Sequence, residues 1–338
     1  MKANRFRLEI VVLLYFLSYT PYAIFTKLLT TQVDVTLGRP LTGLEILPFT
    51  LIVSSTGLIL FLWLSGWWKV VPHRMAGPIP LFRLRPAMWF AGVGTALLLS
   101  ATPLSYTFPG VSIPTVQLLM RGDVLLVAPL VDLIAGRRVK WYSLVALGLV
   151  LVPVVLTLAT RGVFNFPPLL LVVIAAYTVG YLMRLSVMTR IAKNDDPGAM
   201  RLYFVEERII SIPLVIGALG LFAALGTSSQ AHELAWGFTS VWTSNAVPSL
   251  LAISLCLFLV TFFAAMVLLD KHENSYCVPL ERSSSIVAGL VATIILSLTF
   301  GMTFPTATEL FGAVVLVVAI VVLSVGPMLS RGGKGADT

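Results

Sequence analysis

Ten runs of about 20 mainly apolar residues follow one another along the chain. A membrane-spanning α-helix needs about 20 such residues, because that length crosses the hydrocarbon core of a bilayer. The connections are too short for a separate domain, which takes about 50 residues or more. The sequence therefore predicts an all-α polytopic membrane protein. Its ten expected transmembrane helices cover residues 8–29, 42–65, 87–107, 112–135, 141–160, 167–189, 200–225, 247–269, 276–299 and 306–328.

The composition agrees with a chain that lies almost entirely within a membrane. Hydrophobic residues make up 58% of the sequence and charged residues 11%. These proportions lie well outside the range of soluble globular proteins. The formal net charge is +8, but the basic residues are scattered over short connections rather than gathered on one element. That distribution argues against a nucleic-acid partner.

The sequence contains no motif of a known catalytic or cofactor site. Cys256 and Cys277 lie in or beside apolar runs, so neither a disulfide framework nor a zinc site is indicated. His73, His232 and His272 fall in predicted connections and do not have metal-ligand spacing. No phosphate-binding loop, nucleophile elbow or dinucleotide motif is present. We therefore expect no cofactor, no metal and no enzyme activity.

The distribution of lysine and arginine predicts the orientation of the chain, because cytoplasmic loops carry the excess of these residues. Only Arg39 and Arg161 fall in connections on the other side. We therefore expect both termini in the cytoplasm, and a protein of the bacterial cytoplasmic (inner) membrane. The basic residues expected on the inner side are Lys2, Arg5, Arg7, Lys69, Arg74, Arg83, Arg85, Arg137, Arg138, Lys140, Arg190, Lys193, Lys271, Arg331 and Lys334.

Two connections are long enough to have a structure of their own. The inner connection, residues 67–86, is basic and can lie on an anionic leaflet. The outer connection, residues 226–245, contains no lysine or arginine. Its apolar residues Ala231, Leu234, Ala235 and Phe238 have helical spacing. They predict a short interfacial helix.

Short matches between the two halves indicate an internal repeat, with offsets close to half the chain length. An odd number of helices in each half places the second half upside down relative to the first. Such inverted repeats are a transporter architecture, with the substrate near the membrane midplane. We therefore predict two five-helix repeats, residues 1–162 and 163–338. The matches are Tyr19-Thr20 and Lys27 with Tyr177-Thr178 and Arg184, Arg121-Gly122 with Arg282-Ser283, and Gly136 and Gly148 with Gly301 and Gly312.

Residues 117–151, QLLMRGDVLLVAPLVDLIAGRRVKWYSLVALGLVL, resemble the EamA-type pattern of the drug/metabolite transporter superfamily, and residues 281–318 are similar but looser. The resemblance covers essentially the whole chain. It implies ten helices in two inverted repeats, with the first four helices of each repeat around a substrate cavity. It also implies that the fifth and tenth helices can pack against a neighbouring subunit in a homodimer. In several branches, basic residues of the fourth and ninth helices face the cavity, and Arg121 and Arg282 match that placement.

We interpret ten of the charged residues in the predicted helices as intramembrane, where a charge is costly unless it faces a partner or a polar cavity. The set allows two interpretations. The residues either form ion pairs that fix the bundle or line a cavity that binds substrate. They are Lys27, Arg121, Arg184, Arg208 and Arg282, with Glu45, Asp123, Glu206, Glu207 and Glu281.

The leading hypothesis is a secondary transporter for a small organic anionic or zwitterionic metabolite, working by alternating access. Arginine grips carboxylate or phosphate at two points, and four of the five intramembrane bases are arginine. Alternatives are a flippase for an anionic lipid and a membrane-embedded enzyme or receptor. The candidate substrate-binding residues are Arg121, Arg282, Gln117, Asp123, Lys27, Tyr19, Tyr177 and Tyr203. The candidate proton-coupling residues are Glu206, Glu207 and Glu281.

Overall fold

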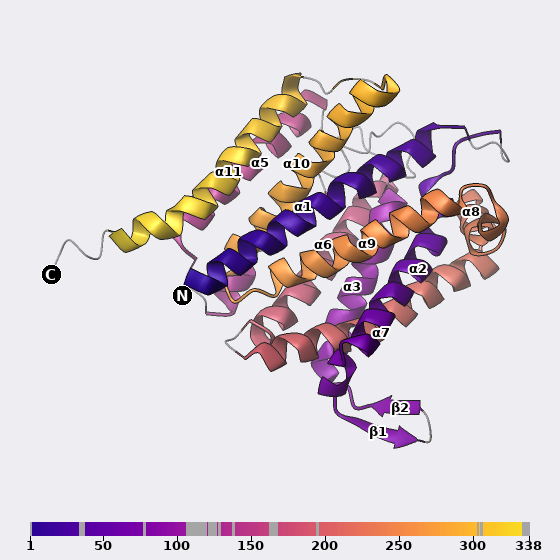
Figure 1. The fold of residues 1–338 in the computed structure, drawn as a ribbon, viewed down its shortest axis with the longest axis horizontal. Helices are drawn as coiled ribbons and strands as arrows, with labels where there is room; N and C mark the ends of the chain where they lie inside the picture. Colours follow the sequence, from indigo (N-terminus) through magenta and orange to yellow (C-terminus); the bar gives the residue numbers. More distant parts are fainter. Residues whose placement is uncertain are drawn as a thin grey trace.

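The computed structural model describes residues 2–33, 38–76, 79–105, 120, 127, 130–136, 139–161, 168–193, 196–302, 304 and 307–332. Within these residues the chain forms ten α-helices, two short 3-10 helices and one β-hairpin (Figure 1). The α-helices are α1 (Lys2–Thr31), α2 (Gly43–Leu64), α3 (Pro86–Ser105), α5 (Trp141–Arg161), α6 (Pro168–Ile191), α7 (Pro197–Leu225), α8 (Ser229–Phe238), α9 (Val247–Leu268), α10 (Asn274–Phe300) and α11 (Ala307–Gly332). The hairpin pairs β1 (His73–Ala76) with β2 (Ile79–Phe82).

The helices follow the predicted spans closely. Nine of the ten spans coincide with a helix, and the other, residues 112–135, lies mostly outside the described residues, where 120, 127 and 130–134 are helical. Within the described residues, six helices are long and apolar enough to cross a membrane. The protein is therefore an integral membrane protein. The hairpin is a small departure from the predicted all-α class, which holds for the bundle itself.

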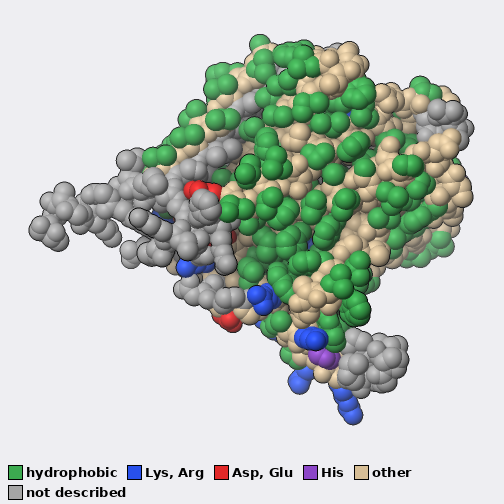
Figure 2. All heavy atoms as spheres, viewed as in Figure 1, with side chains coloured by type: hydrophobic (Ala, Val, Ile, Leu, Met, Phe, Trp, Pro, Cys, Tyr) green, Lys and Arg blue, Asp and Glu red, His purple; other side chains and the backbone are tan. Residues whose placement is uncertain are grey.

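The outer surface of the bundle is apolar. Large side chains such as Leu17, Leu64 and Leu298 are 55%, 69% and 76% exposed. Figure 2 shows apolar side chains over most of one face, with lysine, arginine and histidine gathered at the lower edge beside the hairpin. Soluble proteins rarely expose an apolar surface of this extent. Lipid chains are the environment that suits it.

Helices that are far apart in the sequence pack side by side. α3 packs on α6 and α7, while α9 packs on α1 and α2. α10 contacts α1 and α11, and α11 packs along α5. Figure 1 shows α1 beginning and α11 ending at the same end of the bundle. The early and late parts of the chain therefore interleave in one bundle.

Two of these helices come into backbone contact where α3 and α6 cross at Gly94 and Gly180. A Cβ atom built on Gly94 would lie 2.5 Å from the Gly180 carbonyl oxygen, and one built on Gly180 would lie 2.7 Å from the Gly94 oxygen. Small residues permit such backbone contact between membrane helices. The crossing fixes the position of Thr95 on α3 and of Arg184, one turn further along α6.

Short elements cover the two ends of α2. The short helix predicted in the outer connection is confirmed as α8, which packs on α2 and α7 and buries Ala231 and Leu234. At the other end, α2 leads through a 3-10 helix (Trp67–Val70) into the hairpin, in which His73 lies opposite Phe82. We refer to these as the α8 end and the hairpin end of the bundle. A second 3-10 helix (Ser240–Thr243) joins α8 to α9.

Candidate functional site

Glu45 lies at the α8 end rather than among the intramembrane charges with which the sequence grouped it. It occupies the first turn of α2, where it forms a capping box with Thr42 and an ion pair with Arg39. The hydrogen bond to Glu45 outweighs the effect of burial and raises the pKa of Arg39. Thr42 Oγ1 also donates to Glu233 of α8 over 2.7 Å. These contacts cap a helix end and attach α8 to α2.

Glu206 is held at the hairpin end by Arg85, which immediately precedes α3. Arg85 Nε donates to Glu206 Oε2 over 2.7 Å, and the Arg85 backbone N–H lies 3.2 Å from Oε1. The carboxylate is fully buried, whereas the Arg85 side chain is 36% exposed. The pair joins α7 to the start of α3 and leaves Glu206 well neutralised.

A first buried charge centre lies where α3, α6 and α7 meet. Glu207 Oε1 accepts hydrogen bonds from Arg184 Nε over 2.5 Å and from Thr95 Oγ1 over 2.6 Å. Tyr203 OH donates to the Arg184 carbonyl oxygen over 3.3 Å. We call these residues, with Arg208, the α7 centre. Arg184 lies seven residues from the end of α6, which corresponds to roughly 10 Å of helix.

Arg208 belongs to the same centre but has a different environment. It is 4% exposed, and its guanidinium lies 5.4 Å from the centre of the Phe204 ring. Among the described residues, Arg208 Nε, Glu207 Oε2 and Ser211 Oγ are buried without a hydrogen-bond partner. One carboxylate therefore faces two guanidinium groups, and the centre carries an excess positive charge.

A second buried charge centre lies between α1, α6 and α10. Tyr15 OH donates to Glu281 Oε1 over 2.7 Å. Arg282 Nε lies 3.1 Å from Glu281 Oε2, close enough for an ion pair although not aligned as a hydrogen bond. The Arg282 guanidinium lies 5.0 Å from the centre of the Tyr181 ring. We call these residues, with Tyr177, the α10 centre.

One face of α6 connects the two centres. Tyr177, Tyr181 and Arg184 are spaced four and three residues apart, so they share a helix face. The rings of Tyr177 and Tyr181 lie 6.2 Å apart. On α1, Tyr19 extends the aromatic lining, with its ring 5.7 Å from that of Tyr15. The structure thus brings three predicted tyrosines, Tyr19, Tyr177 and Tyr203, to the two centres.

The remaining candidates lie elsewhere. Lys27 is exposed near the end of α1, away from both centres. Gln117, Arg121 and Asp123 lie outside the described residues. Within the part of the chain that the structure covers, no group of three or more His, Cys, Asp or Glu side chains could hold a metal ion.

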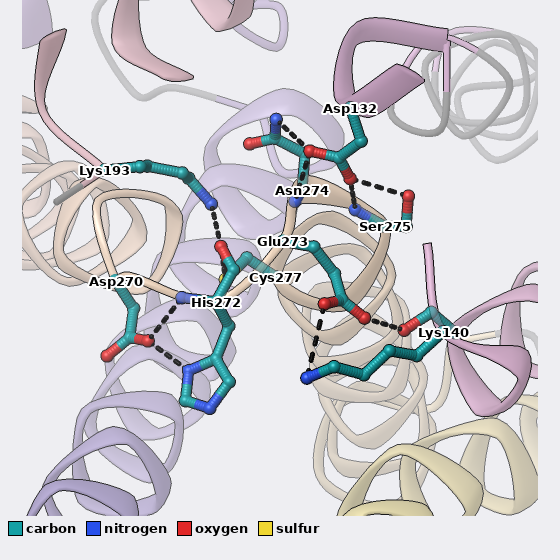
Figure 3. A network of polar contacts seen from close by, with 10 residues as sticks. Asp132, Lys140, Lys193, Asp270, His272, Glu273, Asn274, Ser275 and Cys277 are labelled. Atoms are coloured by element: carbon teal, nitrogen blue, oxygen red, sulfur yellow. Dashed lines mark hydrogen bonds and ion pairs between the residues drawn. The ribbon is translucent and has the colours of Figure 1, made fainter. Parts of the chain in front are cut away.

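A polar network at the hairpin end fixes the start of α10 (Figure 3). The fully buried Asp132 accepts hydrogen bonds from the backbone N–H groups of Asn274 and Ser275, over 3.1 and 2.7 Å. It also accepts Asn274 Nδ2 over 2.8 Å and Ser275 Oγ over 2.7 Å. Asn274 Nδ2 in turn reaches Thr189 Oγ1 of α6 over 2.6 Å. A carboxylate at a helix N-terminus satisfies otherwise unpaired N–H groups.

Neighbouring contacts extend this network to α5 and α6 (Figure 3). Lys193 Nζ donates to the His272 carbonyl oxygen over 2.9 Å. Glu273 accepts from Ser143 Oγ over 2.8 Å and lies 3.5 Å from Lys140 Nζ. Burial alone would raise the pKa of Asp270, but its contacts with His272 outweigh burial and lower it. The network ties the connections at the hairpin end together.

Sequence reasoning missed several partners in these contacts. The sequence places Arg85 in a connection, and its patterns single out neither Thr95 nor Asp132. Asn274 precedes an apolar run and is a typical helix-start residue, which offered a signal for a cap. No spacing rule points from it to an acid 142 residues earlier in the chain.

Comparisons with known proteins place the fold but not the function. No protein-family model and no curated protein matches the sequence. A solved structure described only as a protein crystal structure aligns with a TM-score of 0.63. The alignment covers 96% of this chain and 98% of the other, at 13% sequence identity. The TM-score shows that the two chains share a fold, and a likeness at 13% sequence identity shows the fold alone.

Proposed function

We propose that the protein is a secondary transporter that moves a small organic anionic or zwitterionic metabolite by alternating access. The observation that carries the proposal is the α10 centre, where residues of α1, α6 and α10 surround Arg282, whose side chain is 12% exposed. Buried intramembrane charges mark substrate and ion pathways in membrane proteins. Arginine with neighbouring tyrosines suits an organic solute that bears a carboxylate or phosphate.

The proposed mechanism rests on two inverted five-helix repeats, residues 1–162 and 163–338, which would move relative to each other around the substrate site. The packing supports them, because α3 contacts α6 and α7 while α9 contacts α1 and α2, the partners expected when the halves are exchanged. Gly136 and Gly301, matched by the repeat, both have left-handed φ values, of 70° and 65°. Each follows a helix, where glycine adopts this conformation without strain.

Ten spans with both termini in the cytoplasm complete the proposed topology. Thr227→Cys at the α8 end and Arg74→Cys on the hairpin, in a variant lacking Cys256, place a thiol at each end of α2. An impermeant thiol reagent added to intact bacterial cells should label the first variant and spare the second. Labelling of both from the same side would refute the inverted repeat.

Uptake into sealed vesicles that contain the purified protein tests the proposed function. The panel should include carboxylates, phosphate esters, amino acids, organic cations and fluorescent anionic lipids. We expect uptake of an anionic or zwitterionic solute that Arg282→Gln abolishes and Arg282→Lys impairs, because an ammonium lacks the planar two-point grip. Arg74→Gln, on the exposed hairpin, is the matched control and should transport normally. Movement of the lipids alone would identify a flippase instead.

The same reasoning extends to Arg121, which the sequence places at the matching position of the first repeat. Arg121→Lys and Arg121→Gln should impair uptake as the Arg282 variants do. If these substitutions leave uptake unchanged while the Arg282 substitutions abolish it, the site has one arginine rather than a symmetric pair.

Proton coupling is assigned to Glu281, the predicted coupling acid that lies against Arg282. A solute anion that binds Arg282 competes with Glu281 for the guanidinium, and we propose that a proton travels with the solute on Glu281. An imposed pH gradient should therefore drive uptake by the unmodified protein and should fail to drive it in Glu281→Gln. Equal uptake with and without the gradient would favour solute exchange.

The exposed apolar faces of α5 and α11, which pack on each other, are where we propose that a homodimer forms. Crosslinking between cysteines placed on α11 of two copies tests this contact. A monomer at all protein concentrations in mild detergent would contradict it.

A further inference from the structure

Arg208 of α7 is a buried cation that neither the structural contacts nor the proposed solute site uses. It is 4% exposed, and its Nε has no hydrogen-bond partner among the described residues. Its recorded contact is with the face of the Phe204 ring, which attracts a cation but offers no negative charge. A guanidinium this deeply buried normally faces an acid or a ligand.

The acids around Arg208 make no hydrogen bond to it, although Glu207 Oε2 is buried without a hydrogen-bond partner among the described residues. Glu207 Oε1 accepts from Arg184 and from Thr95, and Glu206 is held by Arg85 on the opposite side of α7. The α7 centre therefore holds two arginines for one carboxylate. One further negative charge would balance it.

Ser211 provides an independent observation at the same place. It lies three residues after Arg208 and therefore shares its helix face. Buried serines elsewhere in the bundle, such as Ser254 and Ser284, donate to the carbonyl oxygen four residues earlier. Ser211 is fully buried, yet its hydroxyl makes no such bond and has no partner in the described part of the chain. A hydroxyl and a guanidinium on one face, both unpartnered, match the donors that an oxyanion requires.

We propose that Arg208 and Ser211 form an oxyanion site that binds a carboxylate or phosphate group. Arg208 supplies the charge and Ser211 a hydrogen bond, while Arg184 and Glu207 remain paired behind them. The inference rests on the proposed transport function in that the oxyanion belongs to the transported solute. This site lies on α7, apart from Arg282 on α10, and gives the solute a second contact on its path through the bundle.

A purely structural role makes the opposite prediction for stability. If Arg208 serves mainly to neutralise Glu207, its loss destabilises the fold. If Arg208 is an unoccupied anion site, the ligand-free protein contains an uncompensated charge, and its removal leaves the melting temperature unchanged or raises it.

Binding of radiolabelled inorganic phosphate and acetate by equilibrium dialysis tests the proposal, using the full chain in lipid nanodiscs at fixed chloride concentration. Arg208→Gln should weaken binding roughly tenfold or more, the loss expected for one charge-assisted contact. Ser211→Ala should weaken it less, and Arg201→Gln, an exposed arginine of the same helix, should bind as the unmodified protein does. Tighter binding of phosphate than of acetate would identify a phosphate site, and the reverse order a carboxylate site.

Thermal unfolding provides the second measurement. Phosphate or acetate should raise the melting temperature of the unmodified protein and of Arg201→Gln, but not that of Arg208→Gln. The proposal is overturned if Arg208→Gln binds both anions normally. It is also overturned if this variant melts at a lower temperature while its affinity for both anions is unchanged.

The dialysis measurement requires no transport, so failure of either proposal is recognised separately. If anion binding depends on Arg208 but vesicles take up no solute, the oxyanion site stands and the transporter proposal fails. If vesicles accumulate an anionic solute equally well with Arg208→Gln, transport stands and the second site is refuted.

Discussion

The α7 and α10 centres bury the same kinds of charge in different proportions. In the α10 centre one carboxylate, Glu281, faces one guanidinium, Arg282, and tyrosines surround both. In the α7 centre one carboxylate, Glu207, faces two guanidinium groups. The first is neutral without a ligand, whereas the second becomes neutral only when an anion arrives. The charge balance therefore predicts that the α10 centre is stable without a ligand, whereas the α7 centre favours a bound anion.

The surroundings of the two centres differ as well. The α7 centre sits beside the Gly94–Gly180 crossing, where two helix backbones touch and leave little freedom. The α10 centre is walled by aromatic rings, which slide and tilt more easily than backbones. We infer that the α7 centre is the rigid part of the pair and the α10 centre the adaptable part. The following substitutions test that distinction, from the largest expected effect to the smallest.

Glu207→Gln should cause the largest loss of stability, because it leaves two buried arginines without an acid. Removing one partner of a buried ion pair costs about 3–5 kcal/mol of unfolding free energy. Thermal unfolding in mild detergent measures the change. Glu281→Gln is the matched substitution in the α10 centre and should cost less, since Arg282 is 12% exposed and keeps the Tyr181 ring.

Adding Arg184→Gln to the Glu207→Gln variant should recover part of the lost stability. The double variant removes the stranded charge that makes the single variant unstable. If the double variant is as unstable as the sum of the two single variants, charge imbalance is not the cause, and the comparison between the centres loses its basis.

Tyr15→Phe and Tyr203→Phe compare one hydroxyl from each centre. Tyr15 donates to a carboxylate over 2.7 Å, a charge-assisted bond worth about 1.5–3 kcal/mol. Tyr203 donates to a backbone carbonyl over 3.3 Å, a neutral bond worth about 0.5–1.5 kcal/mol. We expect the first substitution to lower the unfolding free energy more. The reverse order would place the stronger anchor in the α7 centre.

Gly180→Val should loosen the α7 centre and spare the α10 centre. The new side chain meets the Gly94 backbone, and overpacking of this kind costs about 1–3 kcal/mol. Gly289→Val in α10 is the control, since a Cβ atom there meets nothing within 4 Å. Thermal unfolding should separate the two variants. Equal stability would mean that the α3–α6 crossing relaxes without cost.

Asp270→Asn should have the smallest effect and is confined to the hairpin end. Contacts with His272 lower the pKa of Asp270 below its usual value of 3.8. A carboxyl whose folded-state pKa is depressed stabilises the fold at higher pH and loses that contribution as pH falls through the folded value. The variant should therefore be less stable by about 1 kcal/mol near pH 7. The difference should close below about pH 4, and a constant difference across pH would contradict a stabilising contact of the ionised carboxylate with His272.

The sequence predicted the helices well because the length and apolarity of a helix depend only on consecutive residues. The predicted end of α2 at residue 65 lies one residue from the observed end at Leu64. The same reading grouped Glu45 with the intramembrane charges, although a helix that starts at residue 42 or 43 already places Glu45 in its first turn, where an acid can cap the helix. Glu206 was recognised as a costly charge, but its partner Arg85 lies 121 residues away. Pairings of this kind depend on which helices cross, and periodicity within one helix does not contain that information.

Asp132 has a consequence for the order of events during synthesis. The N–H groups that it caps belong to residues made 142 positions later. At about 5–20 residues per second, the start of α10 is synthesised roughly 7–28 s after Asp132. During this interval Asp132 lacks the hydrogen bonds that it later accepts from the start of α10. Because Asp132 lies at the hairpin end, water can hydrogen-bond its carboxylate during this time. The N–H groups of Asn274 and Ser275 replace that water when α10 is inserted.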